Sequence, residues 1–222
     1  MEKMKTNKGF EIDVTNVSLS ILRNINSTIN RSFHLHSHIL YDLRTMLNKE
    51  EVNYLEIGGW LGSSASLMVS HPQKTNVISV DLWDMNTEHH VKLNDFKNNV
   101  SIFNKNNYPV HTIMGNSNSP LCIEKVKEIT NGVDILFIDG DHSFSGCLND
   151  FINYKDFVTS GGYVVFDDYR DYEWSPHVKH AVDYILDSNM VDGFEVLGFL
   201  KSTFDTGKKY KTFNNEFILR KL

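Results

Sequence analysis

Five short apolar runs, each followed by a stretch with helical pattern, constrain the fold of this 222-residue chain more than any other feature. The runs are residues 52–57, 77–80, 110–114, 134–138 and 162–166. The helical stretches are residues 63–70, 93–102, 121–130, 147–157 and 178–188. Continuous apolar strands that alternate with helices are typical of a parallel sheet with both faces buried. The pattern therefore predicts an α/β fold.

The two ends of the chain depart from this pattern. Residues up to about 48 are predicted to be helical, because apolar residues within 35–47 recur near one helical face. Near the other end, the runs 194–200 and 213–219 are joined only by a loop, which suits an antiparallel hairpin that closes the sheet edge. We expect one domain, residues 1–222. It would comprise an N-terminal helical cap or lid (1–50) and a Rossmann-like, mostly parallel seven-stranded sheet with helices on both faces (51–222).

The composition favours an ordered protein with an acidic surface. Hydrophobic residues make up 41% of the chain and the formal net charge is −6, which is unsuited to a nucleic-acid partner. No run reaches the length of a membrane span, and no apolar stretch follows the polar N-terminus as in a signal peptide. Cys122 and Cys147 lack metal or redox spacing and are expected to be buried thiols. We expect a cytoplasmic protein without a membrane partner, and self-association is left open.

The turn after the first apolar run indicates the kind of ligand. It contains glycines at positions 58, 59 and 62, which permit a tight turn before a helix whose first N–H groups are free to bind a carboxylate. Asp81, at the end of the next run, can accept both hydroxyls of a ribose. Trp60 stands where a dinucleotide fingerprint needs glycine, which argues against a pyrophosphate, and Glu56 suits an ammonium group. S-adenosylmethionine has these features; a glycine turn that serves packing alone is the alternative.

Acidic residues follow the fourth and fifth runs. Asp139, Asp167 and Asp168 would lie close together at the ends of neighbouring strands, where a divalent cation, most simply Mg²⁺, would offset their charges. Asp141 suits a helix-capping role instead. His142 lies three residues beyond Asp139 and is a candidate general base, with a structural histidine as the alternative.

Other aromatic and histidine residues carry weaker signals. Trp83 is assigned to the cofactor site, where it could stack on adenine, although a core or lid role is equally open. His34, His36 and His38 alternate, which as a metal site would require a strand, whereas a helix is predicted nearby. A role for these histidines in a substrate lid is the second alternative.

Five segments of the chain resemble one known family when taken together. They are LEIGGWLGSSAS, VISVDLWD, GNSNS, DILFIDGDHSFSGCLNDF and SGGYVVFDDY. The segments follow one another in the expected order, and the match covers roughly residues 54–186. The chain resembles the class I S-adenosylmethionine-dependent methyltransferases. More narrowly it is similar to the metal-dependent sugar O-methyltransferases of the macrocin O-methyltransferase type, and more distantly to catechol O-methyltransferase.

The resemblance implies a role for each matching residue. Glu56, Gly58 and Ser64 would hold the methionine part of the cofactor, and Gly62 would shape the turn. Asp81 would bind the ribose, and Asn116 and Ser117 the adenine. Asp139, Asp167 and Asp168 would bind the metal, with Asp139 also touching the cofactor and taking part in catalysis beside the base His142. Trp60 departs from the family, in which a tyrosine is commoner there.

The implied function is metal-assisted methylation of a hydroxyl on a sugar or glycan. A phenolic or other small-molecule hydroxyl is the alternative acceptor, and loop 170–177 with the N-terminal helices would select it. Rival classes are a hydroxylase relative, an NAD(P) oxidoreductase, against which Trp60 argues, and a cofactor-binding sensor or scaffold, which would have no use for the carboxylates and His142.

Overall fold

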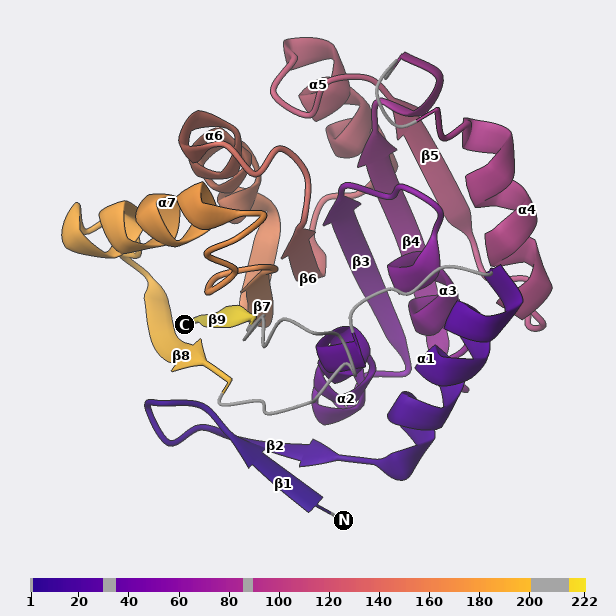
Figure 1. The fold of residues 1–222 in the computed structure, drawn as a ribbon, viewed down its shortest axis with the longest axis horizontal. Coiled ribbons are helices and arrows are strands. Elements are labelled where there is room, and N and C mark those ends of the chain that lie inside the picture. The colour runs from indigo at the N-terminus through magenta and orange to yellow at the C-terminus, as the bar shows by residue number, and fades with distance from the viewer. Residues whose placement is uncertain (1, 30–34, 86–89, 201–215) are drawn as a thin grey trace.

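The computed structural model describes residues 2–29, 35–85, 90–200 and 216–222. Its centre is a seven-stranded sheet in the order β5–β4–β3–β6–β7–β9–β8 (Figure 1). The strands are β3 (Glu51–Ile57), β4 (Lys74–Asp81), β5 (Val110–Met114), β6 (Val133–Ile138), β7 (Val158–Phe166), β8 (Phe194–Phe199) and β9 (Phe217–Lys221). Strands β3 to β7 are mutually parallel, and β9 runs antiparallel to both of its neighbours, β7 and β8. The predicted fold class and the antiparallel edge are confirmed.

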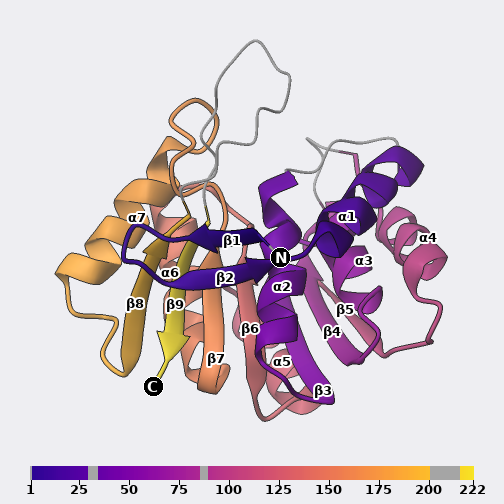
Figure 2. The same cartoon turned by 90° about the horizontal axis from the view of Figure 1, so that it is seen from below.

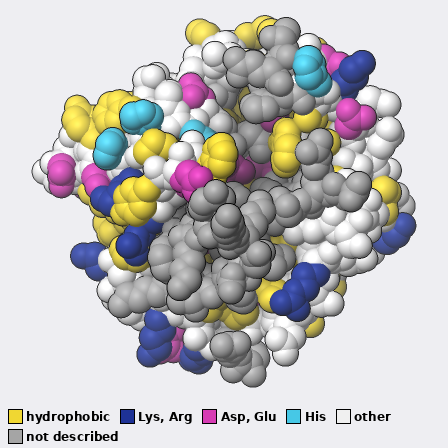
Figure 3. All heavy atoms as spheres, in the orientation of Figure 1, with side chains coloured by type: hydrophobic (Ala, Val, Ile, Leu, Met, Phe, Trp, Pro, Cys, Tyr) yellow, Lys and Arg dark blue, Asp and Glu magenta, His cyan; other side chains and the backbone are white. Residues whose placement is uncertain are grey.

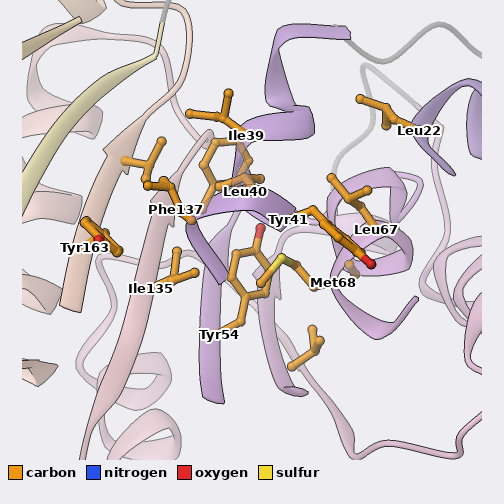
Figure 4. Close-up of a cluster of buried hydrophobic side chains, with 14 of the residues drawn as sticks. Leu22, Ile39, Leu40, Tyr41, Tyr54, Leu67, Met68, Ile135, Phe137 and Tyr163 are labelled. Carbon is orange, nitrogen blue, oxygen red and sulfur yellow. The ribbon is translucent and has the colours of Figure 1, made fainter. Parts of the chain in front are cut away.

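Helices cover both faces of the sheet, as Figures 1 and 2 show. One face carries α3 (Ser63–Val69) and α4 (Leu93–Phe103), and the other carries α5 (Pro120–Ile129), α6 (Phe144–Tyr154) and α7 (Pro176–Asp187). Successive residues of a strand point to opposite faces, so β6 places Ile135 and Phe137 in the first core and Leu136 and Ile138 in the second. Figure 4 shows the first two packed with Tyr54 of β3.

The N-terminal region differs from the predicted run of helices. It begins with a hairpin of β1 (Glu2–Lys5) and β2 (Glu11–Val14), and helices follow only afterwards. The physical reason is visible in β2, where buried Ile12 and Val14 alternate with the more exposed Glu11 and Asp13, a strand period rather than a helical one. The prediction of helix is therefore wrong for the first fourteen residues.

The helices that follow belong to the main core. They are α1 (Asn16–Ile29) and α2 (Ile39–Met46), with a 3₁₀ turn at Leu35–His38 between them. Leu22, Ile39 and Leu40 are fully buried in the same cluster as the β3 and β6 side chains (Figure 4). Residues of this N-terminal region thus help to complete one face of the sheet, and a cap or lid role for residues 1–50 stays a prediction.

The hairpin also contacts the last strand of the sheet. Thr6 pairs with Leu200 in an isolated bridge, and the backbone N–H of Asn7 donates to the carbonyl of Phe199. Figure 2 shows β1 and β2 crossing in front of the sheet toward β8. The contact joins the N-terminal hairpin to β8, the edge strand of the sheet.

Several element boundaries differ from their predicted positions. Helix α6 begins at Phe144 rather than at residue 147, because the Ser143 hydroxyl caps it by accepting from the N–H of Gly146 at 3.0 Å. Strand β7 begins at Val158, four residues early. For β9, predicted over 213–219, residues 213–215 lie outside the described part, and the strand runs on to Lys221. No helix among the described residues is long and apolar enough to cross a membrane.

Candidate active site

A cavity of about 570 Å³ opens beyond the carboxyl ends of the parallel strands. Its wall includes residues that follow four successive strands of the sheet: Gly58 after β3, Asp81 at the end of β4, Ser117 after β5 and Asp139 after β6. Parallel strands bring these ends to one edge, where open α/β sheets bind ligands. Of the six residues that follow predicted strand ends, these four line the cavity, whereas Asp167 and Asp168, which follow β7, are not among its lining residues.

The glycines of the turn after β3 are required by packing. Gly58 has φ +97°, and a Cβ there would lie 1.9 Å from the carbonyl oxygen of Asp139. Gly62 has φ +82°, and its Cβ would meet Val100 at 2.7 Å. Packing therefore accounts for both glycines, and the argument for a cofactor depends on the other residues that line the cavity.

Glu56 lies behind the cavity wall. It is fully buried and accepts hydrogen bonds from the hydroxyls of Ser64 at 2.5 Å, Ser79 at 2.6 Å and Tyr54 at 3.1 Å. Burial raises the pKa of Glu56 to about 7, against the lowering effect of the three hydroxyls. Ser64 lines the cavity and Glu56 does not, so Glu56 reaches the cavity wall through Ser64, and its role at the methionine part of the cofactor stays a prediction.

Asp81 is held with its carboxylate at the cavity wall. One oxygen accepts from the N–H of Trp60 at 2.7 Å and the other from the N–H of Trp83 at 2.8 Å. Each oxygen keeps a further lone pair for a ribose hydroxyl. The backbone of Trp60 thus has a definite role, whatever its side chain contacts.

Trp83 is mainly a core residue. It is 1% exposed, its ring packs against Phe96 at a centroid distance of 5.1 Å, and its indole N–H donates to the carbonyl of Trp60 at 2.9 Å. Of the roles open from the sequence, the core role fits this geometry. Trp83 still contributes to the cavity wall, so contact with the cofactor stays a prediction.

The predicted adenine end is built on loop residues and one buried acid. Asn116 and Ser117 line the cavity, and the Ser117 hydroxyl donates to Asp150 at 2.6 Å. Burial raises the pKa of Asp150 to about 7. Asp150 was not predicted from the sequence, although a signal existed. It lies at helical spacing on the buried stripe of α6 that carries Cys147, Phe151 and Tyr154, where a polar residue is unusual.

Three side chains converge at the other end of the cavity. Nε2 of His142 lies 3.2 Å from Oδ1 of Asp139, and Nδ1 lies 3.7 Å from Oδ2 of Asp168. One potential ligand atom from each residue lies within 4.8 Å of the others. The predicted metal trio contained Asp167 in place of His142. Asp167 is buried next to this group but does not form part of it, and its role as a ligand stays a prediction.

Asp141 and the predicted free thiols have structural roles. Asp141 accepts from the N–H of Ser143, the residue that caps α6, so the proposed capping role is supported, although Asp141 also lines the cavity. Cys122 and Cys147 are buried free thiols, as predicted.

A fourth acid, Glu216, was not anticipated. Strand β9 runs antiparallel to β7 with Phe217 opposite Phe166, which places Glu216 beside Asp167 at the end of β7. Burial and the charges of Asp139, Asp168 and Glu216 raise the pKa of Asp167 well above its usual value. Burial also raises the pKa of Glu216 to about 8. The sequence held one signal for Glu216, namely a charged residue directly before the apolar start of β9.

The same negative charges also raise the pKa of His142, because they stabilise the charged form of its ring. Burial alone lowers the pKa of His142, but the hydrogen bond to Asp139 and the charges of Asp139, Asp168 and Asp141 outweigh burial and raise the pKa to about 9. The residues present fit a hard divalent cation, because several carboxylates whose charges oppose one another offer mainly oxygen ligands. Asp139 and Asp168, with Asp167 behind them, are the residues that would hold it.

The N-terminal histidines do not join this site as far as the structure describes them. His38 is buried, with Nδ1 3.0 Å from Oδ2 of Asp42 and 3.3 Å from the hydroxyl of Ser18. His34 and the side chain of His36 lie outside the described residues, so the metal and lid roles stay predictions.

Comparisons with known proteins agree with this geometry. Residues 55–169 match the family model described as a methyltransferase domain. Uncharacterized protein R132 of Acanthamoeba polyphaga mimivirus is 38% identical over 203 residues, which cover 86% of this chain and 88% of that protein.

Solved structures share the fold at low sequence identity. An O-methyltransferase from Bacillus cereus, solved with S-adenosylhomocysteine (SAH), matches with a TM-score of 0.64 at 15% identity. The match covers 94% of this chain and 92% of the Bacillus cereus chain. MycE methyltransferase from the mycinamycin biosynthetic pathway, solved with Mg, SAH and mycinamycin VI, has a TM-score of 0.57 at 19% identity, with coverage of 90% and 54%. The O-methyltransferase NovP has a TM-score of 0.57 at 17% identity, with coverage of 90% and 78%.

The chain belongs to the methyltransferase-domain family. Its fold is that of the S-adenosylmethionine-dependent O-methyltransferases. The predicted enzyme class, an S-adenosylmethionine-dependent methyltransferase, is confirmed.

Proposed function

We propose that this protein transfers a methyl group from S-adenosylmethionine to a hydroxyl of a sugar or glycan with the help of a divalent cation. The observation that carries the proposal is one cavity whose wall runs from the turn at Gly58 and the carboxylate of Asp81 to Asp139 and His142. A cofactor at one end would thus place its methyl group near a base and a group of acids.

The residues at the cavity have proposed roles in binding or in catalysis. Asp81 accepts ribose hydroxyls and Ser117 lies at the adenine, while Ser64, supported by Glu56, lies at the methionine end. S-adenosylmethionine, when bound, would supply a methyl group on a sulfonium that a hydroxyl oxygen can attack, with SAH as the leaving group. His142 would accept the proton of that hydroxyl on Nε2. Most of the acceleration then comes from positioning.

The proposed cation has a limited role. When bound, it acidifies a hydroxyl that contacts it and offsets the acidic charges that raise the pKa of His142. Asp139 and Asp168 would hold it. The complex of MycE with Mg and SAH supports this part of the proposal by analogy of fold.

Sugar is preferred as acceptor because the motifs resemble the metal-dependent sugar O-methyltransferases. The loop after β7 supports a ring-shaped acceptor, since Tyr172 is 61% and Trp174 75% exposed and aromatic faces suit a flat apolar surface. Figure 3 shows hydrophobic (yellow) and histidine (cyan) side chains side by side over α7, next to this loop. A phenolic acceptor remains the alternative, and the absence of a nucleic-acid partner stays a prediction.

The test is a methyl-transfer assay with S-adenosylmethionine, Mg²⁺ and three acceptors: L-rhamnose, UDP-glucose and 3,4-dihydroxybenzoate. Mass spectrometry would detect SAH and a product heavier by one methylene unit. We expect the sugars to be methylated and EDTA to stop the reaction. Methylation of the phenol alone would favour the alternative acceptor, and failure to bind SAH by calorimetry would contradict the proposal.

A further inference from the structure

The hydroxyl of Ser175 links the two sides of the acidic group. Its Oγ lies 2.8 Å from Nδ1 of His142 and 2.8 Å from Oδ2 of Asp168. Ser175 is 1% exposed, so these two contacts are made inside the protein. It immediately precedes α7, in the loop that follows Asp168.

Counting protons determines which atom donates in each contact. A serine hydroxyl has one proton, and the carboxylate of Asp168 can only accept. Ser175 therefore donates to Asp168 and must accept from His142. Nδ1 of His142 is therefore the donor in the contact with Ser175, and Nε2 is the ring nitrogen on the side of Asp139.

The backbone around Ser175 holds it in place independently of His142. Oδ1 of Asp171, a buried residue, accepts from the N–H groups of Glu173 at 2.9 Å and Trp174 at 3.0 Å. The N–H of Asp171 in turn donates to the carbonyl of Asp168. Ser175 accepts from the N–H of Val178 through its carbonyl as α7 begins. These hydrogen bonds of the turn hold the Ser175 hydroxyl at a fixed position.

We propose that Ser175 is a positioning residue that fixes the ring orientation of His142, with Nδ1 held at the Ser175 hydroxyl and Nε2 turned toward Asp139. The proposal rests on the proposed function, in which His142 is the base. Ser175 touches neither substrate nor cofactor in this role and acts only through His142.

The first test needs no ligand. Protein labelled with ¹⁵N-histidine should show a slowly exchanging imidazole Nδ1–H signal that is absent in His142→Ala. In Ser175→Ala this proton should exchange at least tenfold faster, while Ser175→Thr, which keeps the hydroxyl, should preserve it. His38, whose Nδ1 contacts Asp42, is an internal reference that should not change. Ser66→Ala, at another buried serine, is the matched control. An unchanged His142 signal in Ser175→Ala would overturn the proposal.

The second test is a double-mutant cycle with the acceptor that turns over. Ser175→Ala should lower kcat about 10- to 100-fold, the usual cost of losing a residue that orients a site ligand or base, with KM for S-adenosylmethionine unchanged. In a His142→Ala background the same change should have no further effect. A further loss there would show a merely structural role and overturn the proposal. If no acceptor is methylated, the proposed function fails while the exchange experiment still decides the role of Ser175.

Discussion

Buried acids at the two ends of the cavity are stabilised in opposite ways. At the cofactor end, Glu56 is surrounded by three hydroxyl donors of the protein itself. At the acceptor end, Asp167 and Glu216 face the charges of Asp139 and Asp168. Protein groups thus satisfy the first acid, whereas a cation would relieve the repulsion among the others. The proposed cofactor end is thus built mainly for a fixed shape, whereas the proposed acceptor end carries charges that a cation would offset.

The largest expected effect tests the acceptor end. Asp139→Ala should lower turnover by about 10³-fold or more, because a metal ligand and the partner of His142 are lost together. Calorimetry should find SAH binding nearly unchanged, since the cofactor end is separate. Asp156→Asn, at a side chain that is 79% exposed, is the control. If Asp139→Ala keeps the wild-type rate in the presence of EDTA, metal assistance is wrong.

A glycine variant tests the fixed shape of the cofactor end. Gly58→Ala should destabilise the protein by about 3 kcal/mol, because positive φ and the clash with the Asp139 carbonyl act together. Gly161→Ala is the matched control, since Gly161 has φ +80° but open space around it, and should cost about 1 kcal/mol. Denaturant unfolding measures both. Equal losses would mean that packing against Asp139 is unimportant.

The pKa of Glu56 predicts a pH effect of about 2–3 kcal/mol. Burial raises this pKa from 4.5 to about 7, so the folded state holds the proton more tightly than the unfolded state. The stabilisation is fully present below pH 4.5 and is lost as the pH rises through 7. Glu56→Gln should remove this dependence, so the stability difference from wild type should change between pH 5 and 8. Glu128→Gln, at an exposed site, should leave the wild-type pH profile in place.

The smallest predicted effect is the response of the folded protein to Mg²⁺. At ten times the dissociation constant, binding should stabilise the wild type by about 1.4 kcal/mol through mass action. Thermal unfolding with and without Mg²⁺ measures it, and Asp168→Asn should abolish the gain. The Gly58→Ala variant should keep the gain, because its defect lies in the turn. A response to Mg²⁺ that survives in Asp168→Asn would place the cation elsewhere.

The pattern of strands could be predicted from the sequence because it depends on local periodicity. Apolar runs that end in polar residues identified β3 to β7 and placed Gly58, Asp81, Ser117 and Asp139 at one edge. The N-terminal hairpin was not predicted because its strands are only four residues long. Over so few residues the strand period of two does not stand out beside helical neighbours.

The residues missed at the site share a different cause. Glu216 reaches the acids only through the antiparallel register of β9, and Ser175 only through the turn around Asp171. Neither register nor turn geometry follows from residue type and spacing alone. Asp150 could have been identified from the sequence, because it lies at helical spacing among the apolar residues of α6.

The hairpin at the start of the chain has a consequence for solubility. A sheet edge offers free backbone groups that can recruit a strand from another molecule and start aggregation. In this protein the carbonyl of Phe199 accepts from Asn7, and its N–H donates to the Asn7 side chain at 2.9 Å. Gly198 leaves room for this side chain, since a Cβ there would lie 2.1 Å from Oδ1 of Asn7. Part of the edge of β8 is thereby occupied by the chain's own first residues, which guards the sheet against self-templating.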